Sequence, residues 1–136
     1  MTGNDPERSS EKAGRAAFVV DDDDLTRQLV AAYAEHLGYR PVEVQPDRTA
    51  IADAIADAGT DDVLILDIIL GPELDGFEVI RLLGDVAFRG RLIIVSGFGQ
   101  DYLQTLGSLA TALSIRVAGA LAKPVTPADL ERCLNG

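Results

Sequence analysis

The stretch AAFVVDDDD, residues 16–24, joins five apolar residues directly to four aspartates. A short apolar run that includes β-branched residues predicts a buried strand. A block of like charge is usually a solvated loop. Here, however, adjacent carboxylates stand at the end of a strand, and their mutual repulsion calls for a compensating cation. We interpret the stretch as a buried strand that ends at a cation site.

Four further apolar runs predict strands, with segments of helical spacing between them. The runs are Val42–Val44, Val63–Leu66, Leu92–Val95 and Val117–Ala122. A strand followed by a helix therefore occurs five times. Because each parallel crossover needs a helix, this alternation predicts an α/β fold with a five-stranded, doubly wound parallel sheet.

The helical segments carry capping signals at their ends. Asp24, Asp47 and Thr126 are placed as N-caps, the pair Asp75-Gly76 opens a third helix, and Gly38 ends the first. The first helix has an apolar face that we expect to be buried. That face consists of Leu25, Leu29, Ala32, Tyr33 and Leu37.

Length and composition limit what the chain can be. Its 136 residues allow one domain, which we assign to residues 16–136 after a disordered tail at residues 1–15. No apolar stretch approaches the ~18 residues of a membrane span. A net charge of −10 argues against nucleic-acid binding. The single cysteine, Cys133, excludes an internal disulfide and suits the cytoplasm.

Polar residues follow four of the predicted strands. They are Asp21 and Asp22, then Asp67, then Ser96, then Lys123. Parallel strands end at one edge of the sheet, where open α/β folds carry their sites. Carboxylate oxygens suit Mg²⁺, and a carboxylate beside the metal can become an aspartyl phosphate. The ammonium and hydroxyl groups would stabilise the transferring phosphoryl oxygens.

The ordered set of motifs resembles the receiver domain of bacterial response regulators. The matching segments are Val19–Asp23, Leu66-Asp67, Asp75-Gly76, Val95–Gly97 and Lys123-Pro124. The resemblance covers roughly residues 16–135. It implies a flavodoxin-like (βα)5 fold with strand order 2-1-3-4-5, and a role as a phosphoacceptor in two-component signalling or a phosphorelay.

The resemblance also assigns roles at the metal site. Asp67 resembles the phosphoacceptor and a Mg²⁺ ligand, and Asp22 resembles the direct acidic ligand. Asp21 would act through water or hydrogen bonds, and the backbone carbonyl of Ile69 would be a further ligand. A one-residue shift in register would transfer the role of Asp22 to Asp23.

Two further roles concern the phosphoryl group itself. Ser96 resembles the hydroxyl that turns toward it, and Lys123 resembles the cation that pairs with it. The Lys123–Pro124 peptide bond would be cis, as in the family. The phosphodonor would be a histidine kinase or a histidine phosphotransfer protein.

The chain departs from the family at its switch. The usual aromatic residue three positions before the lysine is Ala120 here. We expect Phe98 or Tyr102 to move instead and reshape the face of the fourth helix and fifth strand. Ile69 and Phe98 flank the path of an attacking water and cannot hydrogen-bond it, so self-dephosphorylation should be slow. The chain would be a switch and not an enzyme.

The output of this switch has two interpretations. The chain acts on a downstream protein, or it is the amino-terminal part of a longer protein with a C-terminal output domain. Residues 96–106 and 117–124 are also weakly similar to receivers that precede cyclic-dinucleotide phosphodiesterase modules. Direct contact with nucleic acid or membrane is not expected.

Two other function classes fit parts of the sequence. A haloacid-dehalogenase-like phosphatase also uses an Asp nucleophile, Mg²⁺ and a Lys, and Asp21 and Asp23 have its spacing. However, Leu25 replaces the usual Thr or Val, no acidic pair follows Lys123, and Asp67 would have no role. A degenerate receiver that only binds partners should have lost acidic or lysine positions, which are all present.

Overall fold

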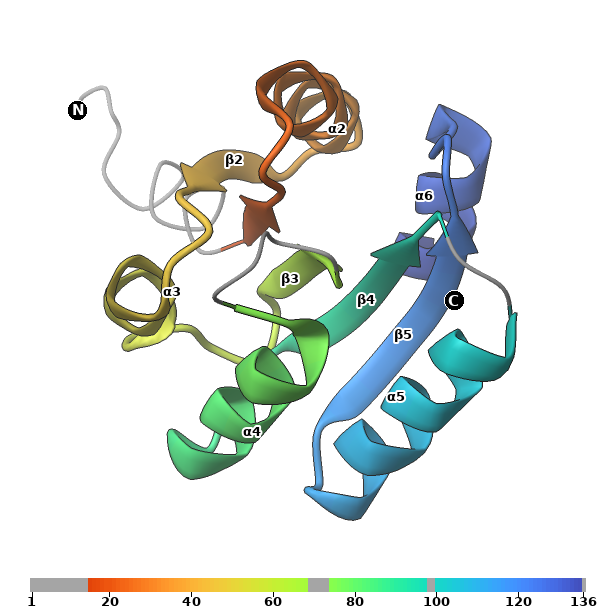
Figure 1. The fold of residues 1–136 in the computed structure, drawn as a ribbon. Coiled ribbons are helices and arrows are strands. Elements are labelled where there is room, and N and C mark those ends of the chain that lie inside the picture. The colour runs from red at the N-terminus through yellow and green to blue at the C-terminus, as the bar shows by residue number, and fades with distance from the viewer. Residues whose placement is uncertain (1–14, 69–73, 98–99, 136) are drawn as a thin grey trace, which may run out of the picture.

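The computed structural model describes residues 15–68, 74–97 and 100–135. Within these ranges five strands and five helices alternate along the chain (Figure 1). The strands are β1 (Ala16–Val20), β2 (Arg40–Val44), β3 (Val63–Asp67), β4 (Arg91–Ser96) and β5 (Arg116–Ala122). The helices are α2 (Asp24–His36), α3 (Arg48–Ile55), α4 (Gly76–Asp85), α5 (Gln100–Ala112) and α6 (Pro127–Asn135). Of the predicted tail at residues 1–15, only Arg15 is among the described residues.

The five strands form one sheet in the order β2-β1-β3-β4-β5, and every neighbouring pair is parallel. The prediction of a doubly wound, flavodoxin-like (βα)5 fold with strand order 2-1-3-4-5 is therefore confirmed. Because all strands run the same way, their carboxyl ends lie together along one edge and their amino ends along the opposite edge.

The helices cover the sheet from both sides, with α3, α4 and α5 on one face and α2 and α6 on the other (Figure 1). Successive strand residues point to opposite faces, so Ile65 packs under α2 and α6 whereas Leu66 packs under α3, α4 and α5. Strands β1 and β3 are buried along their whole length. Each large aliphatic side chain buried in this way contributes about 1.5–3 kcal/mol.

Several predicted caps are present. Asp47 and Asp75 each accept a hydrogen bond from the backbone N–H three residues further on, at 2.8 and 2.9 Å. The Thr126 hydroxyl accepts one at 3.1 Å. Gly38 has a φ of 95° and follows the last turn of α2, a left-handed conformation that glycine adopts readily. These caps satisfy backbone groups that each helix end would otherwise leave without a partner.

The prediction that Asp24 caps the first helix is wrong. The N-cap is Asp23, whose carboxylate accepts a hydrogen bond of 2.9 Å from the backbone N–H of Thr26. Asp24 is already the first helical residue, and its carboxylate instead pairs with Arg27 at 2.7 Å. With Asp23 committed to the cap, the acidic site is left to Asp21 and Asp22.

The predicted apolar face of the first helix is buried only in part, because Tyr33 and Leu37 pack against the core but the leucines at its start do not. Leu25 is 66% exposed and Leu29 is 46% exposed. The buried residues of α2 are Arg27, Val30, Ala31 and Ala34. The small alanines let the helix approach the sheet closely, and polar partners draw Arg27 inward. Apolar spacing alone could not reveal either effect, because α2 has apolar residues on more than one side.

The last strand contains an irregularity that depends on a glycine. Between β4 and β5 the register steps from Val117 to Gly119, so Ala118 is an extra residue. A Cβ atom placed on Gly119 would collide with the sulfur of Cys133 on α6. Gly119 therefore allows α6 to lie directly against β5.

We predict that Gly119→Ala lowers the free energy of unfolding by about 1–3 kcal/mol, because the added methyl group overpacks the contact with Cys133. Removing the sulfur in Gly119→Ala/Cys133→Ala should restore much of this loss. Urea denaturation of the wild type, both single variants and the double variant forms the required cycle. Strictly additive effects of the two substitutions would contradict the proposed contact.

Candidate functional site

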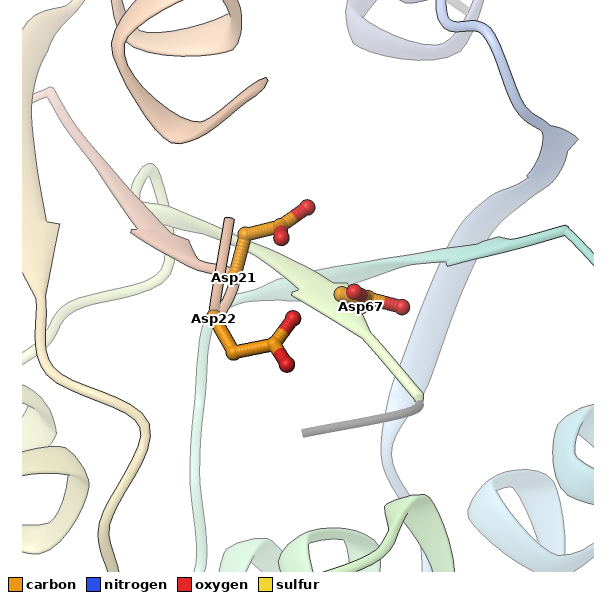
Figure 2. Close-up of side chains that lie close together, drawn as sticks. All are labelled: Asp21, Asp22 and Asp67. Atoms are coloured by element: carbon orange, nitrogen blue, oxygen red, sulfur yellow. The ribbon is translucent and has the colours of Figure 1, made fainter. Parts of the chain in front are cut away.

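Three carboxylates lie together at the carboxyl edge of the sheet. Asp21 and Asp22 follow β1, and Asp67 ends β3 (Figure 2). A carboxylate oxygen from each lies within 4.8 Å of one from each of the others. Asp21 and Asp67 are buried, with 4% and 3% of their surface exposed, whereas Asp22 is exposed. The site is thus a buried acidic pair with a third carboxylate open to solvent.

The strand register produces this cluster. Val20 of β1 lies opposite Leu66 of β3, so the next residues, Asp21 just after β1 and Asp67 at the end of β3, lie side by side at the edge of the sheet. The chain then turns sharply after β1, and the backbone N–H of Asp23 donates to a carboxylate oxygen of Asp21 at 2.8 Å. Two aspartates that are 46 positions apart in the sequence become neighbours because β1 and β3 are adjacent.

Lys123 supplies the positive charge beside the buried pair. Its Nζ atom lies 2.9 Å from Oδ2 of Asp67 and 3.3 Å from Oδ2 of Asp21. Burial alone would lower the pKa of Lys123. The hydrogen bond to Asp67 and the charges of Asp67 and Asp21 outweigh that effect and raise the pKa above its usual 10.5. The side chain is therefore an ammonium ion at neutral pH.

The backbone places Lys123 at this edge. Lys123 directly follows β5, and its N–H donates to the carbonyl oxygen of Ser96 at 2.9 Å, which extends the β4–β5 pairing. The Lys123–Pro124 peptide bond is cis. Ser96 ends β4 and is completely buried. The strand ends that the sequence singled out thus meet along one edge.

The charges at this edge do not balance. Three carboxylates face one ammonium, which leaves a local excess of two negative charges when all are ionised. A divalent cation would neutralise that excess, and Mg²⁺ takes hard oxygen ligands of this kind, usually one or two carboxylates together with water. The carboxylates of Asp21, Asp22 and Asp67 fit such an ion both in chemistry and in mutual distance.

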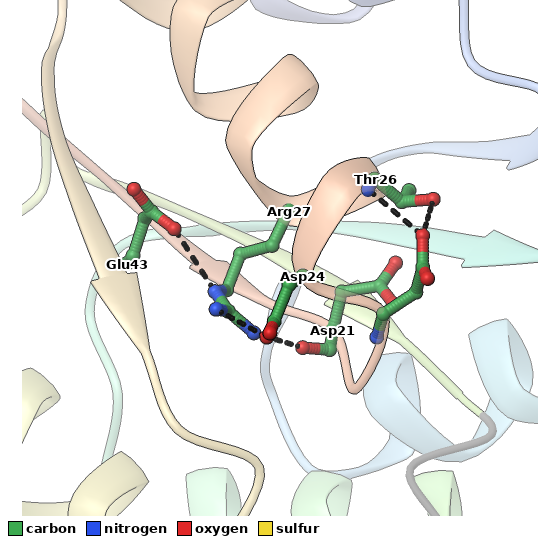
Figure 3. A network of polar contacts seen from close by, with 6 residues as sticks. Asp21, Asp24, Thr26, Arg27 and Glu43 are labelled. Atoms are coloured by element: carbon green, nitrogen blue, oxygen red, sulfur yellow. Dashed lines mark hydrogen bonds and ion pairs between the residues drawn. The ribbon is translucent and has the colours of Figure 1, made fainter.

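A buried arginine on α2, which the sequence analysis did not single out, binds the backbone of the acidic turn (Figure 3). Arg27 of α2 donates to the backbone carbonyl of Asp21 at 2.9 Å, to Glu43 at 3.0 Å and to Asp24 at 2.7 Å. The hydrogen bond to Asp24 raises the pKa of Arg27, so the guanidinium stays charged although it is buried. Its position three residues after Asp24 was the available sequence signal.

The glycine of the Asp75-Gly76 motif has a packing role next to the site. A Cβ atom on Gly76 would lie only 2.8 Å from Cβ of Ile68, the residue that follows Asp67. The Gly76 N–H also donates to the Ile68 carbonyl at 3.1 Å. Glycine here lets the start of α4 pack against the chain as it leaves β3.

Some predicted site residues lie outside the described residues. These are Ile69 and Phe98, together with the side chain of Tyr102, whose backbone belongs to α5. Ala120 is described and is exposed on β5. It lines a groove of about 750 Å³ between α5 and β5, together with Leu103, Gln104, Gly107, Ser108, Thr111, Ala112 and Val117.

Comparison with known proteins gives consistent matches. The family model for the response regulator receiver domain matches residues 17–135. A response regulator from Colwellia psychrerythraea is 29% identical, with a TM-score of 0.71 over 89% of this chain and 94% of that one. Curated proteins give no match.

Two further solved structures share the fold. The receiver domain of a modulated diguanylate cyclase from Desulfovibrio desulfuricans G20 is 23% identical, with a TM-score of 0.68 over 88% of this chain and 90% of that one. A response regulator from Burkholderia pseudomallei, solved with a phosphorylated aspartic acid and a calcium ion, is 18% identical. Its TM-score is 0.67 over 88% of this chain and 66% of that one.

We predict that Arg27→Met lowers the free energy of unfolding by about 1–3 kcal/mol, because the buried carbonyl of Asp21 loses its hydrogen-bond donor. The affinity for Mg²⁺ should fall about tenfold, as when a residue behind a metal ligand is removed. Calorimetric titration measures the affinity, and urea denaturation measures the stability.

The matched control is Arg48→Met, which removes an exposed arginine paired with Glu78 on the surface. It should change neither quantity by a comparable amount. An unchanged Mg²⁺ affinity in Arg27→Met would mean that Arg27 does not position the metal ligands.

Proposed function

Because this chain belongs to the response regulator receiver domain family, we propose that it accepts a phosphoryl group on Asp67 in a reaction that requires Mg²⁺. The observation that carries the proposal is the buried Asp67 carboxylate, which lies 2.9 Å from the Lys123 ammonium and within one cluster with Asp21 and Asp22. Receiver domains are typically switches controlled by phosphorylation and not enzymes.

The chain's own residues support each part of this transfer. An oxygen of Asp67 forms a bond to phosphorus while the bond between phosphorus and the donor nitrogen of a phosphohistidine breaks. Asp21 and Asp22 would hold the metal with Asp67, and Ile69 would add its backbone carbonyl. The bound Mg²⁺ supplies charge neutralisation for the phosphoryl oxygens. Lys123 provides a second cation at the same place.

Ser96 and Lys123 are proposed to bind the phosphoryl group once it is attached. Phosphorylation attaches a group that carries more negative charge and three acceptor oxygens to a carboxylate oxygen of Asp67. Lys123 is already bonded to Asp67, so a small movement of its side chain is enough to reach the new acceptor. Ser96 ends the neighbouring strand and carries the only other side chain that the sequence assigns to this role.

The donor is proposed to be a histidine kinase or a histidine phosphotransfer protein, acting in the cytoplasm. The output is a downstream protein or an attached C-terminal domain. None of the described helices has the length and apolar character needed to cross a bilayer. The Burkholderia pseudomallei response regulator with its phosphorylated aspartic acid supports the chemistry by analogy.

The geometry favours this function over a haloacid-dehalogenase-like phosphatase. That reaction would use Asp21 and Asp23 as its acidic pair. In the structure the Asp23 carboxylate caps α2, whereas Asp67 joins Asp21 and Asp22 in the cluster. The phosphatase scheme leaves the buried Asp67 without a role, and the receiver scheme uses all three clustered carboxylates.

The signal is proposed to leave through the face formed by α5 and β5. Ala120 is exposed on β5 and borders the groove beside α5. An alanine there cannot act as a moving aromatic ring, so we assign that movement to Phe98 or Tyr102. We also propose that self-dephosphorylation is slow, because the side chains of Ile69 and Phe98 exclude water from the phosphoryl group.

We predict that a small phosphodonor or a cognate histidine kinase labels the protein only when Mg²⁺ or a similar divalent ion is present. Asp67→Asn should abolish the base-labile label, because an amide cannot form the acyl phosphate. The variant should remain folded, since the amide is nearly isosteric with the carboxylate. Label incorporation and circular dichroism measure the two outcomes.

Asp23→Asn is the matched control, because Asn is as good an N-cap as Asp. It changes an acid in the same run and should leave labelling intact. Asp22→Ala should raise the Mg²⁺ concentration needed for half-maximal labelling. Undiminished labelling of Asp67→Asn would overturn the assignment, and loss of labelling in Asp23→Asn would favour the phosphatase scheme.

The proposed switch makes a separate prediction. Beryllofluoride, a phosphoryl mimic, should shift amide resonances at residues 96–106 and 117–124 in the presence of Mg²⁺. Asp67→Asn should show no such shifts. A response confined to the immediate neighbours of Asp67 would contradict signal transmission through α5 and β5.

A further inference from the structure

A row of arginines lies at the amino edge of the sheet, opposite the acidic site. Arg15 immediately precedes β1, and Arg40, Arg91 and Arg116 are the first residues of β2, β4 and β5. The strand register aligns them, because Arg91 lies opposite Arg116 and Arg40 lies opposite the residue after Arg15. Four of the chain's 12 basic residues therefore lie along one edge of a protein whose net charge is −10.

Three of these arginines line a hollow of about 440 Å³. Its lining residues are Arg15, Tyr39, Thr60, Asp61, Arg91, Arg116, Leu134 and Asn135. Asp61 is the only carboxylate among them. The described lining residues thus carry three positive charges against one negative charge, and the volume of the hollow falls within the range of small-molecule pockets.

The guanidinium groups in the hollow are held by neutral partners. Arg91 donates to the Leu134 carbonyl at 3.1 Å and to the Tyr39 hydroxyl at 2.8 Å. Arg116 donates to the carbonyls of Thr60 and Arg89, at 2.6 and 2.9 Å. These bonds fix the positions of two cations without neutralising either charge.

Arg15 and Tyr39 have hydrogen-bond donors that no described residue accepts. The Arg15 guanidinium stacks 4.3 Å from the centre of the Tyr39 ring and has no hydrogen-bond acceptor within the described part of the chain. Tyr39 is 94% buried, and its hydroxyl accepts from Arg91 but donates to none of the described residues. Among those residues, Arg15, Arg91 and Arg116 also form no salt bridge. Within the described part of the chain, the Tyr39 hydroxyl has no acceptor and the three guanidinium groups pair with no carboxylate, which points to an anionic ligand.

We propose that this hollow binds a small anion that carries two or more phosphate groups. Several guanidinium forks match phosphate oxygens, which accept paired N–H bonds. A single carboxylate would neutralise only one of the three cations. A nucleic acid would extend past the hollow and meet the repulsion of a chain with net charge −10, whereas a compact ligand stays within the basic edge.

This site is distinct from the proposed phosphorylation site. The two lie at opposite ends of the same strands, and the arginines share no contact with Asp21, Asp22 or Asp67 among the hydrogen bonds and ion pairs described above. The proposal therefore does not depend on the receiver function, and either can fail without the other.

The test is a calorimetric titration with inorganic pyrophosphate at low ionic strength, in the presence of EDTA so that no metal recruits the anion to the acidic edge. The wild type should bind one equivalent of pyrophosphate in the calorimeter. In a parallel NMR titration, amide resonances should shift at residues 39, 60, 61, 91 and 116. Arg15→Gln should weaken binding about tenfold, because it removes one charged donor. Tyr39→Phe should weaken it while keeping the ring under Arg15.

The matched control is Arg48→Gln, which changes net charge equally at an exposed arginine on α3. It should bind pyrophosphate as the wild type does. No measurable binding by wild type, or equal weakening in Arg48→Gln and Arg15→Gln, would overturn the proposal. Binding of a pentaglutamate peptide in place of pyrophosphate would also overturn it, since the site would then be one for acidic peptides.

Discussion

Lys123 lies between two buried carboxylates, 2.9 Å from Asp67 and 3.3 Å from Asp21, and the carboxyl edge of the sheet depends on this contact. A buried charge is costly unless it is paired and hydrogen-bonded. One ammonium makes burial of Asp21 and Asp67 tolerable, while the exposed Asp22 leaves the edge short of positive charge. The same arrangement therefore stabilises this edge of the fold and brings together carboxylate oxygens of the kind that a divalent cation takes as ligands.

Arg27 complements Lys123 from the opposite side of the acidic turn. Lys123 contacts the carboxylate of Asp21, whereas Arg27 binds the backbone carbonyl of the same residue. Arg27 therefore fixes the backbone of the turn without occupying a carboxylate oxygen, whereas the two carboxylate oxygens of Asp21 contact the Asp23 N–H and Lys123. The inward position of Arg27 also sets the rotation of α2 about its axis, which leaves Leu25 and Leu29 exposed. Site geometry and helix packing are thus linked through one side chain.

The sheet separates charge between its two edges. Its carboxyl edge gathers aspartates, and its amino edge gathers arginines that precede or begin four strands. Parallel pairing makes this separation possible, because residues at equivalent positions in every strand fall on the same edge. A protein with a large negative charge can in this way keep a local basic surface. The two edges are expected to select ligands of opposite charge.

The strands, their alternation with helices and the residue types at the strand ends are predictable from the amino-acid sequence, because apolar runs mark buried parallel strands and the residue after each run lies at one edge. The sequence also predicts the caps at Asp47, Asp75 and Thr126. Tertiary contacts determine which aspartate of residues 21–24 caps α2, which face of α2 is buried, and which groups Arg27 binds. Those outcomes depend on polar partners from distant segments, which apolar periodicity does not record. The arginine row likewise depends on strand register, which aligns residues that are far apart in the sequence.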